Sequence, residues 1–445
     1  MPKISYLDHV ATLLPLEEVE IFQSCYQQKL PKTIKVVTSK IAIKDFVKLV
    51  TDMCWELEQT IQSDVFYVRK FTDSATLGQH FLHQGWFFYI QELSASMSAP
   101  LLGAQRWEII LDMCAAPGGK TIQLADTGAF VISNEPLNPR RKALIYNINR
   151  TWMINTAVTN IDGSRFGQEY PEFFDKILVD APCSGEGMSY KTGGPISRNE
   201  WLIKSLARTQ VKLLESAINA CKVGGKIVYS TCTLNEIENE EVVSTILEKY
   251  KWIVELEFSK KYRPHRDNCG GFFVAVFRKT DRDAINHVST NKTTQKIPLK
   301  TPDFNLSEKL QSQIKTYLNE QFGITKIPDN NIFFSTINTI YVTIKDYQSI
   351  HGKLSLDKVW IPLFNISRDN KRIPLHSLGN IFGSLAQKAV LELNNQKAQA
   401  YWQQKDLSIV EEIQSTSDNF LLLKRKNYGF SLAKKVGDFL KNKLM

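Results

Sequence analysis

Two cysteines of this chain stand in settings that suit covalent chemistry. Residues 180–185 read Asp-Ala-Pro-Cys-Ser-Gly around Cys183, and residues 229–233 read Tyr-Ser-Thr-Cys-Thr around Cys232. Each motif follows a short apolar run that is typical of a buried parallel strand. Because ligands and catalytic groups of open α/β sheets lie beyond the carboxyl ends of the strands, both thiols are expected to face one crevice. A thiolate there could form a covalent intermediate.

A glycine-rich segment joins the first expected strand of this sheet to its helix. Residues 112–121 read Asp-Met-Cys-Ala-Ala-Pro-Gly-Gly-Lys-Thr, and the glycines allow the backbone to pass close to a ligand. The spacing is neither that of a dinucleotide-binding fingerprint nor that of a phosphate-binding P-loop. A tight strand-to-helix turn would use the same glycines, so the ligand interpretation depends on the neighbouring strands.

Four successive strands are expected to end at carboxylates, namely Asp112, Glu135, Asp162 and Asp180. Each carboxylate alone is more simply a cap or a turn residue. Together they make an acidic rim, in which Glu135 could accept hydrogen bonds from both ribose hydroxyls and Asp162 could face an adenine edge. This rim suits a cationic nucleoside without phosphates, and S-adenosyl-L-methionine is a sulfonium cation of that kind.

A methyl donor beside two thiols suits methylation of cytosine at C5. Addition of a thiolate at C6 makes C5 nucleophilic, and the C5 proton and the thiol must leave after methyl transfer. A free cysteine has a pKa of about 8.5, so the site must favour the thiolate. Cys269 is left open, and the remaining cysteines are interpreted as small buried apolar residues: Cys25, Cys54, Cys114 and Cys221.

These segments resemble the motifs of the NOL/NOP/Sun (RsmB/NOP) family of RNA cytosine-5 methyltransferases. Residues 112–121 resemble its S-adenosylmethionine motif, residues 180–187 its base-contact motif and residues 229–240 its nucleophile motif. The motifs stand in the family's order, and the resemblance is strong over residues 85–280. It implies a Rossmann-like class I core that uses S-adenosyl-L-methionine and acts on RNA.

The resemblance also implies a role for each matching residue. Cys232 would be the nucleophile on C6, Cys183 would aid release of the methylated product, and Asp180 would lie near both cytosine and cofactor. In DNA cytosine methyltransferases the cysteine after proline is instead the nucleophile, so swapped roles are the alternative. The other implied cofactor contacts are Ala115, Ala116, Pro117, Gly118, Gly119, Lys120, Thr121, Glu135 and Asp162.

The C-terminal part resembles the tail of the bacterial RsmF-type enzymes of this family. That resemblance implies a PUA-like RNA-binding module and, as partner, 16S rRNA or the small ribosomal subunit. Upstream, residues 35–38 read Lys-Val-Val-Thr and depart from the expected Arg-Val-Asn-Thr. The matching C-terminal segments are residues 360–364, 373–376, 401–402, 405–407 and 441–442.

The net charge of +9 favours a polyanionic partner. Near the C-terminus Tyr428 and Phe430 interleave with cations, so phosphates could be neutralised while unpaired bases stack on the rings. From this segment alone, a solvated basic surface is the simpler interpretation. The target cytosine is expected in a loop or flipped from its stack. The cations are Lys424, Arg425, Lys426, Lys434, Lys435, Lys441 and Lys443.

The elements that must position these residues alternate between strand and helix from residue 107 to residue 280. This alternation predicts a doubly wound α/β domain closed by a hairpin of residues 253–256 and 272–277. Outside this domain, helices are expected at residues 14–28, 45–61 and 378–393, and a strand at residues 34–38. The expected core strands are residues 109–113, 130–134, 157–160, 176–179 and 226–230.

The composition divides the chain into five segments around this core. A polar stretch rich in threonine, asparagine and lysine is the expected linker. The segments are an N-terminal α+β RNA-binding extension (1–100), the methyltransferase core (101–280), the linker (281–303), a small α+β connecting domain (304–359) and a PUA-like β-rich RNA-binding domain (360–445).

The global properties agree with a globular protein of two or three domains. The chain has 445 residues, of which 43% are hydrophobic. It contains no apolar run near the ~18 residues that cross a bilayer and lacks a secretory signal, so a cytoplasmic location without a membrane partner is expected. Seven scattered cysteines without a Cys-x-x-Cys pair argue against disulfides and zinc, so no metal is expected. We also expect a monomer.

Three other functions are alternatives to methylation of small-subunit rRNA. The same chemistry on tRNA is a possible alternative. A catalytically silent RNA-binding assembly factor is disfavoured, because both cysteines are intact. An adenine N6 methyltransferase is rejected, because Asp-Ala-Pro-Cys at residues 180–183 replaces the Asn/Asp-Pro-Pro-Tyr/Phe of those enzymes. The target nucleotide, and the choice between naked RNA and a ribosomal particle, stay open.

Overall fold

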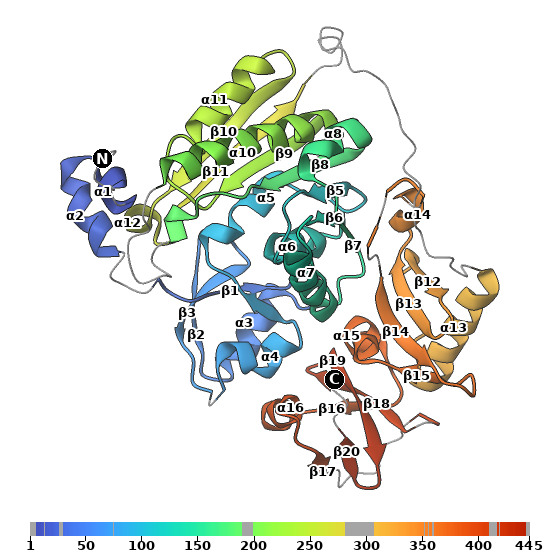
Figure 1. Cartoon of the computed structure of the whole chain (residues 1–445). Helices are drawn as coiled ribbons and strands as arrows, with labels where there is room; N and C mark the ends of the chain where they lie inside the picture. Colours follow the sequence, from blue (N-terminus) through green and yellow to red (C-terminus); the bar gives the residue numbers. More distant parts are fainter. Residues whose placement is uncertain are drawn as a thin grey trace.

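A seven-stranded sheet, with the strand order β10-β11-β9-β8-β5-β6-β7, forms the centre of the middle part of the chain (Figure 1). The strands from β5 to β9 pair in parallel, while β10 and β11 form an antiparallel hairpin beside β9. The predicted doubly wound α/β domain with a closing hairpin is therefore confirmed. The strands are β5 (Ile109–Asp112), β6 (Phe130–Asn134), β7 (Thr156–Thr159), β8 (Phe174–Asp180), β9 (Cys221–Thr231), β10 (Val254–Tyr262) and β11 (Phe272–Lys279).

The structure is a computed structural model, and the predicted linker at residues 281–303 lies outside the residues that it describes. No helix among the described residues is long and apolar enough to cross a membrane. The described residues are 6–12, 14–25, 30–73, 75–188, 199–280, 307–350, 352–354, 356–357, 360–408, 416–417 and 419–441.

Helices cover both faces of the central sheet. Ile177 of β8 packs in one apolar cluster with Leu214 of α10, whereas the next residue, Leu178, packs in another with Ile122 of α6. Successive strand side chains point to opposite faces, so burial on both faces explains the nearly continuous apolar runs. The covering helices are α5 (Ser98–Leu102), α6 (Gly119–Asp126), α7 (Asn138–Thr151), α10 (Glu200–Ala220) and α11 (Glu240–Lys249).

The N-terminal part forms its own four-stranded sheet, β2-β3-β1-β4. The helix predicted over residues 45–61 is wrong in its second half, because α3 ends at Thr51 and β2 follows. Cys54 has a φ of 61°, which turns the chain, and β2 then pairs with β3. The elements here are α1 (Tyr6–Ala11), α2 (Leu16–Cys25), β1 (Thr33–Val36), α3 (Ile43–Thr51), β2 (Glu56–Gln59), β3 (Val65–Lys70) and β4 (Phe88–Ile90).

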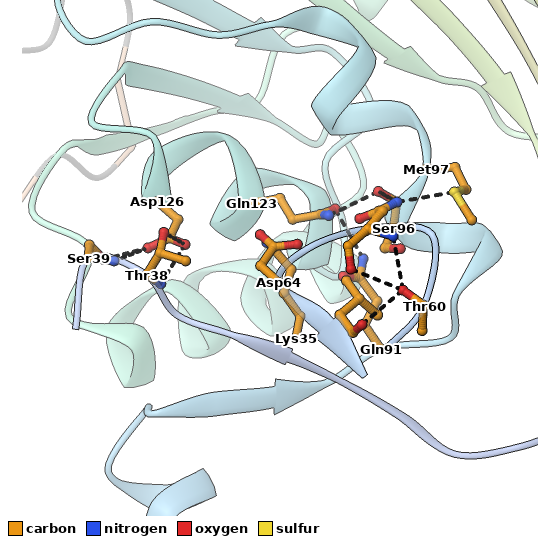
Figure 2. Close-up of polar contacts among 12 residues, drawn as sticks. Lys35, Thr38, Ser39, Thr60, Asp64, Gln91, Ser96, Met97, Gln123 and Asp126 are labelled. Carbon is orange, nitrogen blue, oxygen red and sulfur yellow. Dashed lines mark hydrogen bonds and ion pairs between the residues drawn. The ribbon is translucent and has the colours of Figure 1, made fainter. Parts of the chain in front are cut away.

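Helix α6 is clamped to the N-terminal part at its carboxyl end. Figure 2 shows the carboxylate of Asp126 against Thr38 and Ser39. Asp126 accepts hydrogen bonds from the backbone amides of both residues, at 2.9 and 2.8 Å, and from both hydroxyls. Further along α6, Gln123 donates to the carbonyl of Ser96 at 3.0 Å (Figure 2). These contacts hold the helix whose other end begins in the predicted cofactor loop.

The C-terminal part contains two further sheets, β12-β13-β14-β15 and β16-β18-β19-β20-β17. The first sheet runs across the boundary predicted between residues 359 and 360, because β13 pairs with β14. The elements are α13 (Glu308–Phe322), β12 (Asn331–Ser335), β13 (Thr339–Ile344), α14 (Asp346–Ile350), β14 (Ile361–Ile366), β15 (Arg372–Pro374), α15 (His376–Phe382), β16 (Val390–Glu392), α16 (Asn395–Trp402), β17 (Leu407–Ser408), β18 (Phe420–Arg425), β19 (Tyr428–Val436) and β20 (Phe439–Lys441).

The helix predicted over residues 378–393 is also wrong in its second half. Helix α15 ends at Phe382, and β16 pairs in parallel with β18. A Cβ atom added at Gly383 would lie 2.9 Å from the Cα atom of Gly429, so the backbone passes unusually close to β19 at this point. This tertiary contact redirects the chain where local helical periodicity predicts continuation.

The C-terminal part packs directly against the N-terminal part and the central domain. One apolar cluster contains residues of both terminal parts, including Phe81 and Phe430, whose ring centroids lie 6.2 Å apart. Thr343 of β13 donates to the carbonyl of Ile154 at 2.9 Å, and Arg141 of α7 forms a 2.7 Å ion pair with Asp357. The C-terminal part is therefore joined by packing to the rest of the protein (Figure 1).

This packing engages both aromatic rings of the basic C-terminal end and buries one of them. Phe430 is buried in the shared cluster, and the hydroxyl of Tyr428 donates to Asp45 at 2.9 Å. Four of the cations are also engaged. Lys424 donates to the carbonyl of Ala386 and Arg425 to Asn395, while Lys426 pairs with Asp52 and Lys441 with Asp406. Lys443 lies outside the described residues.

Candidate active site

The two cysteines predicted to act together lie side by side at the carboxyl ends of neighbouring strands. Asp180 at the end of β8 pairs with Ser230 near the end of β9, so both strands deliver their following loops to one place. The Sγ atoms of Cys183 and Cys232 lie 3.1 Å apart, and the backbone amide of Cys232 donates to the Cys183 sulfur at 3.3 Å. Both residues keep partial solvent exposure, so a substrate can reach them.

The surroundings make the two thiols chemically different. The contact with Cys232, followed by burial, raises the pKa of Cys183 well above its usual range. The same contact lowers the pKa of Cys232, and the charge of Lys120 acts in the same direction. The directions of these two shifts favour a proton on Cys183 and a thiolate at Cys232. This arrangement favours Cys232 over Cys183 as the attacking group.

Asp180 connects the end of strand β9, which precedes Cys232, to the predicted cofactor loop. Its two carboxylate oxygens accept hydrogen bonds from the Lys120 ammonium at 2.7 Å and from the Ser230 hydroxyl at 2.8 Å. Burial disfavours the charged amine, but Asp180 outweighs it and raises the pKa of Lys120. The pair thus presents an oriented carboxylate and a fixed positive charge within the crevice.

Asp112 and the loop after it form the next part of the site. Asp112 is 1% exposed, its Oδ2 accepts from the Thr121 hydroxyl at 2.7 Å, and its Oδ1 has no hydrogen-bond partner among the described residues. Burial raises the pKa of Asp112 to about 7. Within the loop, Gly118 has a φ of 114°, a conformation that other residues rarely adopt.

Glu135 and Asp162 end the two remaining strands of this edge. Glu135 is buried, and its carboxylate accepts from the backbone amide of Leu137 at 2.9 Å and lies 3.3 Å from the guanidinium of Arg140. Asp162 is exposed and accepts from the amide and hydroxyl of Ser164, so it caps the following turn. The simple capping interpretation therefore applies to Asp162, although its exposed carboxylate still borders the rim.

These residues fit S-adenosyl-L-methionine. Asp112 is the last residue of β5, Glu135 follows β6 and Asp162 lies three residues beyond β7, which places three carboxylates along one edge of the sheet. The unpartnered Oδ1 of Asp112 is a buried acceptor that a cationic ligand could satisfy. At Gly118 the φ of 114° and the Leu144 side chain, which would lie 3.1 Å from an added Cβ atom, both disfavour any other residue. The site offers hydrogen-bond acceptors but has no phosphate-binding loop, and this combination matches a cationic nucleoside without phosphates.

A buried polar network behind the thiols has no role that the sequence alone predicts. The Glu238 carboxylate accepts from the Ser184 amide at 2.9 Å, from Gln210 at 2.8 Å and from Asn235 at 2.7 Å. Asn235 also donates to Glu186 at 2.7 Å. One available signal was Gln210, a polar residue on the buried side of the long helix α10. The network joins both cysteine loops to that helix.

The N-terminal helices contact the loop that carries Cys232. Leu234, two residues beyond that cysteine, packs in one apolar cluster with Val10 and Phe22 of α1 and α2. The first two helices therefore support the nucleophile loop, a contact between distant segments that local periodicity does not reveal.

Comparisons with known proteins show the family of this chain. A family model described as 16S rRNA methyltransferase RsmB/F matches residues 99–278. Proteins named ribosomal RNA small subunit methyltransferase F are similar to this chain. The relative from Vibrio cholerae serotype O1 is 30% identical over 97% of this chain and 93% of its own length, and that from Aeromonas salmonicida is 31% identical over 99% and 95%.

Solved structures resemble a part of this fold. A methyltransferase homologue from Pyrococcus horikoshii is 26% identical, with a TM-score of 0.55 over 61% of this chain and 94% of its own. The crystal structure of NSun6 from Pyrococcus horikoshii with SFG is 20% identical, with a TM-score of 0.56 over 62% and 98%. At that identity, the second likeness concerns the fold alone.

Proposed function

Because the chain belongs to the RsmB/F family of rRNA methyltransferases, which use S-adenosyl-L-methionine, we propose that it forms 5-methylcytosine in 16S rRNA through a covalent bond between Cys232 and cytosine C6. The observation that carries this proposal is the thiol pair, with Sγ atoms 3.1 Å apart and with the pKa of Cys232 lowered by its contact with Cys183. The acidic rim supplies a site for the methyl donor beside it.

The first step uses the asymmetry between the two sulfurs. The Cys232 thiolate forms the bond to C6, and the electron pair of the C5–C6 double bond makes C5 nucleophilic. We propose that Asp180, which is held by Lys120 and Ser230, accepts a hydrogen bond from the cytosine amino group. Such preorganised polar groups orient the base and stabilise charge that develops on it.

S-adenosyl-L-methionine, when bound, supplies the methyl group that C5 takes. A base must then remove the C5 proton, and the bond between Cys232 and C6 must break, with its electron pair returning to sulfur. Cys183 can assist this last step, because its S–H donates to the Cys232 sulfur and stabilises the departing thiolate. The same hydrogen bond that activates Cys232 before attack therefore favours its release.

The RNA substrate follows from the family and from charge. Relatives covering nearly the whole chain are named for methylation of small-subunit rRNA, and the net charge of +9 favours a polyanion. A cytosine must leave its stack to reach a thiol within a crevice, so an unpaired or flipped base fits best.

The proposal is tested by the identity of the methylated nucleoside. Purified protein and labelled S-adenosyl-L-methionine would be incubated separately with 16S rRNA, small ribosomal subunits and tRNA, each lacking this modification. Digestion and mass spectrometry should find labelled 5-methylcytidine in 16S rRNA, alone or within the subunit. Label in another nucleoside would overturn the cytosine-5 chemistry, and label confined to tRNA would overturn the rRNA substrate.

A further inference from the structure

Charged groups are distributed unevenly around the thiol pair. The buried carboxylate of Glu238 lies on the Cys183 side, where its Oε1 accepts from the backbone amide of Ser184, the residue next to Cys183. The ammonium of Lys120 lies on the other side, paired with Asp180 at 2.7 Å. A negative charge near one sulfur and a positive charge near the other would bias where a shared proton resides.

Hydrogen-bond donors surround the carboxylate of Glu238. Its two oxygens accept hydrogen bonds from three donors, namely Ser184, Gln210 and Asn235. An ionised carboxylate only accepts hydrogen bonds, so it suits all three donors, of which Asn235 is shared with Glu186. Glu238 is 0% exposed, and little water is present to screen its field on the neighbouring loop.

The direction of each thiol's shift agrees with this charge distribution. After the contact with Cys232 and burial, the charge of Glu238 is a further cause of the raised pKa of Cys183. At Cys232 the contact with Cys183 lowers the pKa, burial and Asp180 oppose it, and Lys120 supports it. Glu186, the other carboxylate of the network, is held by Asn235 and by the Thr233 hydroxyl at 2.8 Å.

We propose that Glu238 selects the nucleophile, because its carboxylate keeps the proton shared by the two sulfurs on Cys183 and leaves Cys232 as the thiolate. Glu238 is a positioning residue that acts through Cys183 and touches no substrate atom. This inference rests on the proposed function, since the choice of thiolate matters only if one of the sulfurs attacks a base. Its test needs neither RNA nor methyl donor.

Site-resolved alkylation of the full-length protein measures this selection directly. The probe is iodoacetamide, a neutral reagent that alkylates thiolates, and mass spectrometry gives the initial rate at each cysteine across pH 6–9. The variants are Glu238→Gln, whose amide oxygen can still accept from Ser184, and Glu238→Asp, which keeps the charge. Glu241→Gln is the matched control, because Glu241 is an exposed carboxylate of α11 outside the network.

Wild type and Glu241→Gln should alkylate Cys232 much faster than Cys183. In Glu238→Gln the ratio of the two rates should fall about tenfold or more, the change that one pKa unit gives in thiolate fraction. Glu238→Asp should largely keep the ratio, even if it is less stable. An unchanged ratio in Glu238→Gln, or equal losses in the Gln and Asp variants, would overturn the proposal.

The outcome is separable from that of the proposed function. If the wild-type protein made no 5-methylcytidine in any RNA, the proposed function would fail. The alkylation ratios would still show which of the two sulfurs, that of Cys183 or that of Cys232, holds the shared proton. If wild type methylated 16S rRNA but Glu238→Gln kept the alkylation ratio, only the selecting role of Glu238 would fail.

Discussion

Asp112 should make the affinity for S-adenosyl-L-methionine depend on pH. The side chain is buried beside the cofactor loop, its Oδ1 has no hydrogen-bond partner among the described residues, and burial raises its pKa to about 7. Below that pH the free protein holds a neutral carboxylic acid at the place where a cation is expected. A cationic ligand should bind the carboxylate form better, so affinity should rise as pH rises through 7.

The size of the effect follows from the fraction of carboxylate in the free protein. With a pKa of about 7, roughly one molecule in eleven carries the carboxylate at pH 6 and roughly ten in eleven at pH 8. Apparent affinity scales with the competent fraction, so the dissociation constant should fall about tenfold between these pH values, or ~1.4 kcal/mol. Asp112→Asn has no charge to titrate and should lack this change.

Isothermal titration calorimetry of both full-length proteins from pH 6 to pH 8 measures the effect. The ligand's own amino group titrates identically in both experiments, so the ratio of wild-type to variant affinity isolates Asp112. That ratio should rise about tenfold with pH. A ratio that stays constant would refute the reasoning, because it would mean that Asp112 does not change its proton when the ligand binds.

Three further substitutions test the nucleophile, a contact to the cofactor and the apolar core that the terminal parts share. Cys232→Ala should abolish methyl transfer and leave calorimetric affinity for S-adenosyl-L-methionine unchanged, since the thiol acts on the base; near-normal turnover would remove it from the nucleophile role. Glu135→Ala should weaken that affinity by ~1–3 kcal/mol through loss of a buried acceptor, and an unchanged affinity would reduce Glu135 to a strand-end carboxylate. Phe430→Ala should destabilise the protein by ~3–5 kcal/mol in denaturant unfolding, because Phe430 fills the cluster shared by the N- and C-terminal parts. Phe439→Ala is the control, because the Phe439 side chain is partly exposed. Equal losses of stability in the two variants would contradict the shared core.

The sequence predicts those features that depend on local pattern. Apolar runs predict the parallel strands, because strands buried on both faces need apolar residues at nearly every position. The topology rule for open α/β sheets then predicts that Cys183 and Cys232 meet at one edge, and the structure places their sulfurs 3.1 Å apart. The roles of the two thiols stay predictions, since they depend on the reaction.

Local sequence patterns do not predict features that depend on contacts between distant segments. The helix predicted over residues 378–393 ends early because β16 pairs with β18, about thirty residues further along the chain. Phe430 reads as an exposed ring in a basic segment, yet it packs near Phe81. Glu238 reads as one of several acidic residues in a motif, and only the fold brings Gln210 and Ser184 to it.

The central claim, that Cys232 bonds to cytosine while Cys183 aids release, is tested most directly by trapping the covalent intermediate. Cys183→Ala and Cys232→Ala would each be incubated with S-adenosyl-L-methionine and labelled 16S rRNA, then separated on a denaturing gel. Cys183→Ala should give an RNA-labelled protein band of reduced mobility, because the bond to C6 forms but breaks slowly. Cys232→Ala should give none. A band from Cys232→Ala, with none from Cys183→Ala, would contradict the account and exchange the two roles.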